Sequence, residues 1–497
     1  MTTERRIPES RLGRLMHLGR LAGGIAGGAL SEGARQLGQG RRPSLGDLLL
    51  TPANARRLAD RLSELRGAAM KVGQILSMEA GEFLPPELTE VLHRLRANAH
   101  TMPLGQVADV LTQAWGKGWE RGFKRFSFTP LAAASIGQVH EATTREGLHL
   151  AVKVQYPGVR RSIDSDVDNV ATLLNLFRLI PADIDVGPLL AEAKRQLHQE
   201  ADYQQEAVLL GRFADQLAGD PGFEVPQVLA SHTTPEVLAM TFLTGRPIED
   251  LREAASAERN RVATALLDLT LREVFDWGLV QTDPNFANYR YRDDGCIQLL
   301  DFGAVREYPP VWRESFRGML KAAVERDAAG IEQGAIAIGY LGAEDPADYR
   351  AAMVTLVEDA VEPPRSPGGY HFGRSDLARR MSEKVLDLRL RQRFGRLPPP
   401  GMLFLHRRLG GLYLLFSHLS AEVPVQELVA RHTSAPFGNA RGAAPAPDQA
   451  RPRPSDRHLL TGAGRAEVGE PALEPLLAGL DQGQRIPQAV QPGISPG

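Results

Sequence analysis

The sequence predicts an α+β enzyme with two lobes, preceded by a helical extension. Three patterns in the 497 residues support this prediction. Apolar residues recur at helical spacing over 51–95, short runs typical of strands begin at about residue 123, and mainly helical spacing extends from about 249 to 419. We therefore expect helices first, then a β-rich lobe, then a helical lobe.

The composition excludes several classes of protein. Hydrophobic residues make up 43% and charged residues 24%, as in an average globular protein, which excludes collagen-like, wholly disordered and polytopic membrane proteins. The 58 Lys and Arg against 60 Asp and Glu leave a net charge of -2, so we expect no nucleic-acid partner. The single cysteine, Cys296, cannot form an internal disulfide, so we expect a buried thiol and a reducing, cytoplasmic location.

Residues 1–45 form a basic, glycine-rich segment in which Gly19, Gly23 and Gly27 recur at four-residue spacing. Because this spacing lets helices approach closely, the segment is predicted to associate with a membrane surface or to form a homodimer; a weakly structured leader is the alternative. No run of 18 apolar residues occurs, and the apolar stretch 21–30 is short. We therefore expect peripheral membrane association, and neither a transmembrane span nor a secretory signal.

Four further ranges follow this segment. The helical extension is expected at 46–122, the β-rich N-lobe at 123–248 and the helical C-lobe at 249–430. Residues 431–497, which are rich in Pro, Gly and Ala, are expected to form a mostly disordered tail.

The predicted N-lobe contains strands with two helices inserted among them. The run HLAVKVQY alternates as a strand does, and 225–228 and 237–242 also predict strands. Apolar spacing over 163–180 and 188–213 predicts the two helices.

The predicted C-lobe carries the strongest chemical signal, the run QTDPNFANYRYRDDGCIQLLDFG over 281–303. Asp283 and Asn288 lie five residues apart in a predicted loop, and Asp301 opens Asp-Phe-Gly after a short apolar strand at 297–300. Phosphoryl transfer needs a carboxylate beside the nucleophile and hard oxygen ligands for Mg²⁺, which this order supplies. Asp283 is therefore the predicted catalytic carboxylate, and Asn288 and Asp301 are the predicted metal ligands.

Lys153 and the segment before it supply the matching half of a nucleotide site. Lys153 lies in an alternating run, as expected of a strand lysine that contacts the phosphates of ATP. About twenty residues earlier, Ala132, Ala133, Ala134 and Ser135 occupy the position of a phosphate loop, with alanines in place of glycines. Because a Cβ limits how closely backbone N–H groups approach phosphate, we expect nucleotide geometry unlike that of ordinary protein kinases.

A lysine in this role needs an acidic partner on a nearby helix. Glu200, Asp202 and Glu206 are the candidates, and a solvated helix face is the alternative interpretation. Glu206 shares a helix face with Asp202 at four-residue spacing, whereas Glu200 and Asp202 do not share one. The 53 residues between Lys153 and Glu206 imply an inserted helix.

These motifs, in this order, resemble those of the UbiB (AarF) family of atypical kinase-like proteins, most closely its coenzyme Q biosynthesis branch. The resemblance spans about residues 10–420 and includes Lys-x-Gly-Gln at 71–74, the alanine loop at 132–135 and Glu-Ala-Asp at 200–202. The catalytic segment begins Gln-Thr-Asp-Pro-Asn, a form similar to the mitochondrial-type branch.

The resemblance implies a protein-kinase-like fold whose N-terminal extension covers the active site. Lys71 and Gln74 of the extension would reach into the site and face Glu200 and Asp202, so that these four residues would gate it. It also implies the cofactors ATP and Mg²⁺, with Lys153 and Glu206 paired at the phosphates.

The resemblance further implies an ATPase that supports ubiquinone (coenzyme Q) biosynthesis at a membrane, with anionic or quinone-precursor lipids and proteins of that pathway as partners. Two alternatives remain open: phosphoryl transfer to a small molecule or lipid, with Asp283 as base for a hydroxyl, and a nucleotide-gated, lipid-binding scaffold without turnover. Phosphorylation of other proteins is the least favoured activity, because the alanine loop and the lysine-bearing extension both oppose it.

Overall fold

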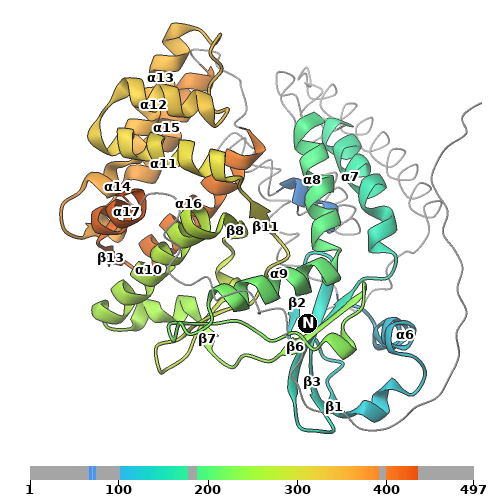
Figure 1. Ribbon diagram of the computed structural model, residues 1–497. Helices are drawn as coiled ribbons and strands as arrows, with labels where there is room; N and C mark the ends of the chain where they lie inside the picture. The colour runs from blue at the N-terminus through green and yellow to red at the C-terminus, as the bar shows by residue number, and fades with distance from the viewer. Residues whose placement is uncertain (1–66, 70, 74–100, 177–186, 391–398, 435–497) are drawn as a thin grey trace, which may run out of the picture. The chain divides into compact units, whose positions relative to one another are not determined.

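Figure 1 shows the computed structural model, which describes residues 67–69, 71–73, 101–176, 187–390 and 399–434. The glycine-rich segment 1–45 and residues 435–497 lie outside this described part, so membrane contact and dimer formation through the segment stay predictions. Among the described residues, no helix is both long enough and apolar enough to cross a membrane.

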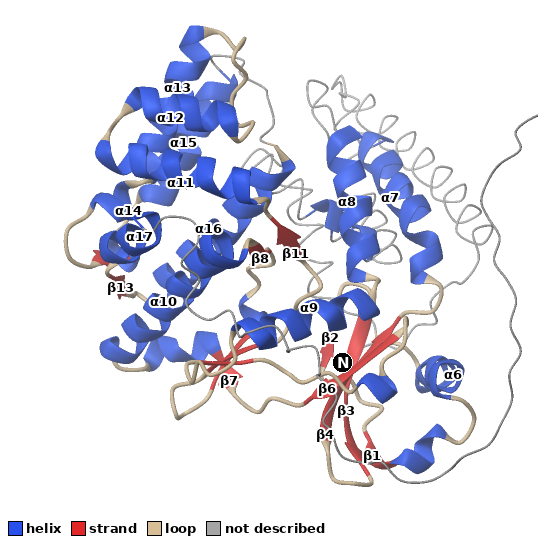
Figure 2. Ribbon diagram, in the orientation of Figure 1, coloured by secondary structure: helices blue, strands red, loops and turns tan. Residues whose placement is uncertain are grey.

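An antiparallel sheet forms the centre of the predicted N-lobe (Figure 2). Its strand order is β1-β3-β4-β6, and the short β2 pairs with β3. The strands predicted at HLAVKVQY and 237–242 are confirmed as β4 and β6. The strands of this sheet are β1 (Phe123–Phe126), β2 (Ala132–Ala133), β3 (Gly137–Thr144), β4 (His149–Gln155) and β6 (Val237–Thr241).

The register of this sheet places Lys153 in its interior. Lys153 lies opposite Val139 of β3 and Leu238 of β6, so strands flank it on both sides. At the start of β3, a Cβ on Gly137 would overlap the carbonyl group of Val154. Glycine therefore allows β3 to pair closely with β4 at the end nearest the alanine loop.

Helix α6 (Leu104–Trp115) packs against this sheet. Its buried Val107 and Leu111 belong to the same hydrophobic core as Leu150 and Val152 of β4. The helix lies in the range assigned to the extension, yet its apolar face is part of the sheet's core.

In the described part of the chain between β4 and β6 there are three inserted helices, where the sequence predicts two. The inserted helices are α7 (Val159–Leu176), α8 (Gly187–Glu200) and α9 (Tyr203–Gln216). The prediction of one continuous helix over 188–213 is wrong, because the chain breaks after Glu200. Asp202 caps α9 by accepting a hydrogen bond from Gln205 N at 3.1 Å, and Gln155 Nε2 of β4 donates to Ala201 O at 2.8 Å.

A second sheet has the order β5-β10-β9-β7, from β5 (Phe223–Glu224), β7 (Arg246–Pro247), β9 (Tyr289–Tyr291) and β10 (Ile297–Leu299). The strand predicted at 297–300 is confirmed as β10. The strand predicted at 225–228 is wrong: pairing occurs two residues earlier, where β5 lies parallel to β10. Pro226 lacks the N–H that a strand ladder needs, and Val228 forms only an isolated bridge with Met240.

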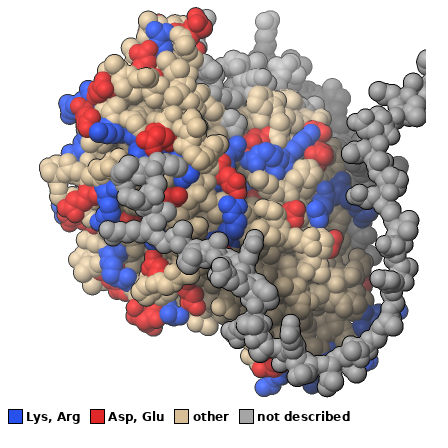
Figure 3. Space-filling model, in the orientation of Figure 1, with Lys and Arg blue, Asp and Glu red and all other residues tan. Residues whose placement is uncertain are grey.

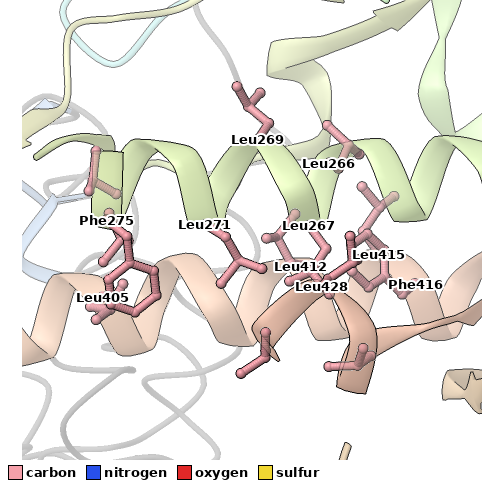
Figure 4. Packing of buried hydrophobic residues seen from close by; sticks show 14 of the residues in the cluster. Leu266, Leu267, Leu269, Leu271, Phe275, Leu405, Leu412, Leu415, Phe416 and Leu428 are labelled. Atoms are coloured by element: carbon pink, nitrogen blue, oxygen red, sulfur yellow. The ribbon is translucent and has the colours of Figure 1, made fainter. Parts of the chain in front are cut away.

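The helical part of the chain packs around α10 (Ser256–Leu271), which continues into a π-helical segment, Arg272–Trp277. Figure 4 shows Leu267 and Leu271 of α10 pointing toward α16 (Pro400–His418), with Leu412 and Leu415 facing them. Leu428 of α17 (Val425–Ser434) lies beside this contact. Burial of these side chains holds α16 in place, and α16 carries two arginines that the site uses.

The remaining elements complete the helical part. The helices are α11 (Pro310–Glu325), α12 (Ala328–Ala337), α13 (Ala347–Ala360), α14 (Glu362–Arg365) and α15 (Leu377–Leu390), and the paired strands are β8 (Leu279–Gln281) with β11 (Val305–Glu307) and β12 (Tyr370–His371) with β13 (Glu422–Val423). Because α17 continues through Ser434, its last turn lies in the range assigned to the tail. On the face shown in Figure 3, acidic and basic side chains are interspersed.

Candidate active site

Lys153 lies at the centre of a buried charged cluster. Its Nζ donates to Glu206 Oε1 at 2.5 Å and to Asp301 Oδ2 at 3.1 Å. Glu206 comes from the first turn of α9, which the cap at Asp202 begins, and Asp301 follows β10. Three residues predicted for the site are thus in direct contact, although 148 residues separate Lys153 from Asp301.

One lysine faces two carboxylates in this cluster, so negative charge is in excess when all three groups are ionised. Burial opposes the charge of Lys153, but Asp301 and Glu206 outweigh this effect and raise the pKa of the amine. Burial raises the pKa of Glu206 to about 7, although Lys153 opposes the shift. Burial also opposes the charge of Asp301, but Lys153 and the Gly303 N–H outweigh it and lower the pKa of that carboxyl. A cation near Asp301 would offset the excess negative charge.

Asn288 is held beside the start of the Asp-Phe-Gly segment. Leu300 N donates to Asn288 O at 2.9 Å, directly before Asp301. The Asn288 amide nitrogen donates to Asp283 Oδ2 at 3.1 Å, which leaves its amide oxygen as the side-chain atom suited to a metal.

These donors can be compared with what Mg²⁺ requires. Among the described residues, no group of three or more His, Cys, Asp or Glu is arranged to hold a metal ion. Mg²⁺ is commonly bound by one or two carboxylates together with substrate phosphates and water. Asn288 and Asp301 supply hard oxygen atoms of this kind, so they fit Mg²⁺ that is shared with a nucleotide.

The Asp283 carboxylate forms an ion pair that the sequence analysis missed. Arg407 Nη2 of α16 lies 2.6 Å from Asp283 Oδ1, and only 9% of the arginine side chain is exposed. The contact spans 124 residues, so no local spacing reports it. One sequence feature could have indicated this ion pair: Arg407 and Arg408 stand next to each other in an otherwise apolar helix. Arginines buried by such a helix need acidic partners elsewhere in the chain.

Arg408 holds both ends of the loop that carries Asp283 and Asn288. Its side chain is 1% exposed and donates to Gln281 Oε1 at 3.0 Å, to Glu273 Oε1 at 3.3 Å and to the Tyr289 hydroxyl. Glu273 also accepts from Gln281 N at 3.2 Å. Burial raises the pKa of Glu273 to about 7, although Arg408 opposes the shift. One buried ion pair therefore anchors the strands before and after the loop.

The alanine loop is a tight hairpin. Ala132 and Ala133 form the exposed strand β2, and Ala134 N donates to Gly137 O at 2.9 Å. The backbone of three of the four predicted loop residues is therefore set by pairing with β3.

Glu200, at the end of α8, connects the extension with this loop. Its Oε2 accepts from Ser135 Oγ at 2.6 Å, and its Oε1 pairs with Lys71 Nζ. Lys71 is 4% exposed. A Cβ on Gly67 would lie 2.9 Å from Ser135 O, so this described part of the extension packs directly on the loop.

Two of the predicted gating residues stand apart from this contact. The Asp202 carboxylate is used as the cap of α9. Gln74 lies outside the described residues, and the role predicted for it stays a prediction.

Comparisons with known proteins agree on one family. Residues 94–335 match the model of the ABC1 atypical kinase-like domain. The chain is 35% identical to "Atypical kinase COQ8, mitochondrial" of Saccharomyces cerevisiae, over 85% of this chain and 84% of the yeast protein. It is 36% identical to "Atypical kinase COQ8B, mitochondrial" of Rattus norvegicus, over 86% of this chain and 81% of the rat protein.

A solved structure agrees with this likeness. The structure of Rv3197 with erythromycin, from Mycobacterium tuberculosis, is similar with a TM-score of 0.54 and 27% identity, over 77% of this chain and 97% of that chain. The structural similarity supports the α+β architecture, and the family model identifies a kinase-like domain within it. The chain belongs to the UbiB (AarF) family and is an atypical kinase.

Proposed function

We propose that the protein is a Mg²⁺- and ATP-dependent ATPase of the atypical kinase type that supports coenzyme Q biosynthesis at a membrane. The observation that carries this proposal is the buried cluster of Lys153, Glu206 and Asp301. Asp283 and Asn288 lie in the adjoining loop. Similarity to proteins named COQ8 and to the coenzyme Q branch of the family supports the pathway.

Lys153 would contact the phosphates of ATP, with Glu206 holding the amine in place. The hairpin formed by Ala132, Ala133, Ala134 and Ser135 would cover the nucleotide. Its Cβ atoms limit how closely the backbone approaches the phosphates, which supports a nucleotide geometry specific to this family.

Asn288 and Asp301 would hold Mg²⁺ through oxygen atoms. When bound there, Mg²⁺ would supply positive charge that offsets the negative charge of the phosphates. Asp283 would orient the attacking water or hydroxyl, and Arg407 fixes the direction of that carboxylate.

The extension supports ATP hydrolysis over protein phosphorylation. Lys71 pairs with Glu200, which also binds Ser135, so the extension and the nucleotide loop share one acidic group. We assign a gating role to Lys71, Gln74, Glu200 and Asp202. A gate of this kind favours a small or lipid partner, such as an anionic lipid or a quinone precursor, over a folded protein substrate.

Phosphate release from Mg-ATP by the purified full chain tests the proposal, with and without anionic liposomes. We expect turnover that increases with liposomes and is abolished by Asp301→Asn, because the amide removes a charged metal ligand. Asp293→Asn is the matched control: it is the same substitution in the same segment, at an aspartate whose side chain is 96% exposed. Equal turnover in the two variants would refute the assigned role of Asp301.

The same assay separates the two alternatives. Label from γ-³²P-ATP that appears on an extracted lipid or phenol, and not as free phosphate, would indicate a phosphotransferase. Bound nucleotide without phosphate release under any condition would indicate a scaffold.

A further inference from the structure

The end of the N-lobe sheet that lies away from the candidate active site combines basic and apolar side chains. We call it the N-lobe tip, and it comprises residues 117–126 and the turn 144–148 between β3 and β4. The two ranges adjoin, because Arg145 N donates to Gly122 O at 3.0 Å and Arg145 Nε donates to Arg121 O. In Figure 1 the tip is the lower end of the sheet, around the β1 label.

The tip carries exposed cations without partners. In the described part of the chain none of them forms an ion pair; they are Lys117, Arg121, Lys124, Arg125 and Arg145. Two exposed acids of the tip oppose them, Glu120 and Glu146. The nearby Glu141 lies 2.8 Å from His149, which shares its charge. By contrast, the exposed Arg379 pairs with two neighbouring acids. Positive charge therefore predominates at the tip and is not neutralised by ion pairs.

Apolar side chains lie among these cations. Leu148 is 46% exposed in the turn after β3, three residues from Arg145. Trp119 is half-buried, and its ring meets the Phe126 ring edge-on at 5.2 Å. Tryptophan is favoured where one end of a side chain is apolar and the other is wet, as at the headgroups of a membrane. Exposed leucine and long basic side chains suit the same boundary.

We propose that the N-lobe tip binds the surface of an anionic membrane. The cations would attract the headgroups, Leu148 would enter between them, and Trp119 would lie at their level. An acidic protein would also match the charge, but it would need a pocket fitted to Leu148, whereas a bilayer accepts the side chain without one. The inference rests on the membrane partner of the proposed function and assigns that contact to a surface outside residues 1–45.

Docking through the tip would leave the nucleotide site away from the membrane surface. Lys153 and His149 both belong to β4, and His149 directly follows the turn at the tip. At the rise of a strand, the distance between these two residues is about 13 Å. ATP could therefore reach Lys153 while the tip holds the chain at the membrane.

Flotation of the purified full chain with lipid vesicles tests the proposal in the absence of nucleotide. One set of vesicles contains phosphatidylcholine alone, and the other contains phosphatidylcholine with phosphatidylglycerol. We expect binding at least about tenfold tighter to the anionic vesicles, and a loss of this preference at high salt, which screens exposed charges. Equal binding to both kinds of vesicle, or no binding to either, would overturn the proposal.

A charge variant assigns the binding to the tip. Arg121→Gln combined with Lys124→Gln should weaken binding to anionic vesicles at least about tenfold. The matched control combines Arg252→Gln with Arg374→Gln, at two exposed arginines that form no ion pair in the described part of the chain. Unchanged unfolding midpoints in urea verify that all variants fold. Equal binding by the tip variant and the control would refute this proposal, while the membrane partner of the proposed function would stand.

A dye at residue 148 tests whether the turn enters the membrane. Leu148→Cys is labelled with acrylodan, whose emission shifts to the blue in an apolar environment; the native Cys296 is 4% exposed and so is protected from the label. We expect a blue shift with anionic vesicles, and none for Val311→Cys, at a valine that is 80% exposed. A bound protein whose dye at 148 stays in water would overturn the proposal. Because neither measurement uses ATP, failure of the ATPase assay is a separate outcome.

Discussion

The ion pair with Arg407 shows that the Asp283 carboxylate is held in a fixed orientation. An aspartate that acts alone would be free to rotate, but here Arg407 and Asn288 each hold one of its two carboxylate oxygens. A positioning group of this kind affects the chemical step more than nucleotide binding.

We predict that Arg407→Gln lowers kcat for ATP hydrolysis about tenfold and leaves KM for ATP within about twofold of its normal value. The reason is that Arg407 pairs with Asp283, the carboxylate assigned to the chemical step. Steady-state phosphate release at several ATP concentrations measures both constants. Arg431→Gln, at an exposed arginine of α17, controls for the loss of one charge. A raised KM with an unchanged kcat would show that Arg407 acts on nucleotide binding instead.

The break between α8 and α9 is the element that brings Glu206 to Lys153. Asp202 starts α9, and Glu206 lies in its first turn. Loss of a helix cap costs about 1 kcal/mol and frays the first turn. We therefore expect Asp202→Ala to lower the free energy of unfolding by about 1 kcal/mol and to weaken ATP binding. Urea denaturation and nucleotide titration measure the two effects.

Asp202→Asn separates capping from charge, because asparagine is as good a cap as aspartate. If Asp202 serves mainly as a cap, the asparagine variant keeps both stability and ATP affinity. If it loses ATP affinity and keeps stability, the carboxylate itself has the gating role.

Helix α17 is attached to α10 and the π-helical segment by a protonated histidine. Burial opposes the charge of His432, but hydrogen bonds with Asp268 and Asp276 outweigh this and raise its pKa to about 9. Arg431 also pairs with Asp268. Because the folded pKa lies above the unfolded value of about 6.5, this stabilisation is fully present below pH 6.5 and is lost as the pH rises through 9.

We predict that His432→Gln lowers the free energy of unfolding by roughly 1–3 kcal/mol at pH 6.5 and by much less at pH 9.5. Urea denaturation of both proteins at the two pH values gives the difference. His198→Gln is the control, at an exposed histidine that pairs with Asp164. A difference between the proteins that does not change with pH would mean that His432 is neutral in the folded state.

The elements that could be predicted are those whose signal is local. Strand β4 and strand β10 follow from alternating or apolar runs bounded by turns. The end of α8 could not be predicted, because apolar spacing continues across Ala201 and the break depends on a hydrogen bond from Gln155 in another strand. Strand β5 likewise depends on parallel pairing with β10, far along the chain.

The same distinction applies to the candidate site. Lys153 and Asp301 stand in recognisable motifs, so sequence reasoning selects them, and the structure puts them 3.1 Å apart. Arg407 stands in no motif. Its position depends on how α16 packs against the rest of the helical part, which only the fold shows.

At the scale of the whole molecule, one acidic side chain links three distant segments. Glu200 of α8 binds Lys71 of the extension and Ser135 of the alanine loop. Gly67 packs on the same loop, where a larger side chain would contact Ser135 O. Movement of the extension is therefore expected to change the order of the alanine loop.

We predict that Lys71→Met increases amide hydrogen exchange both at 67–73 and in the alanine loop at 132–137. The ion pair with Glu200 is lost, and a partly buried carboxylate that has lost its cationic partner favours an opened state in which water reaches it. Exchange followed by mass spectrometry measures both segments in the intact chain. Lys321→Met, at an exposed lysine of α11, should leave both segments unchanged. Faster exchange at 67–73 alone would show that the extension opens without disturbing the loop, and Glu200 would then hold Ser135 independently of the gate.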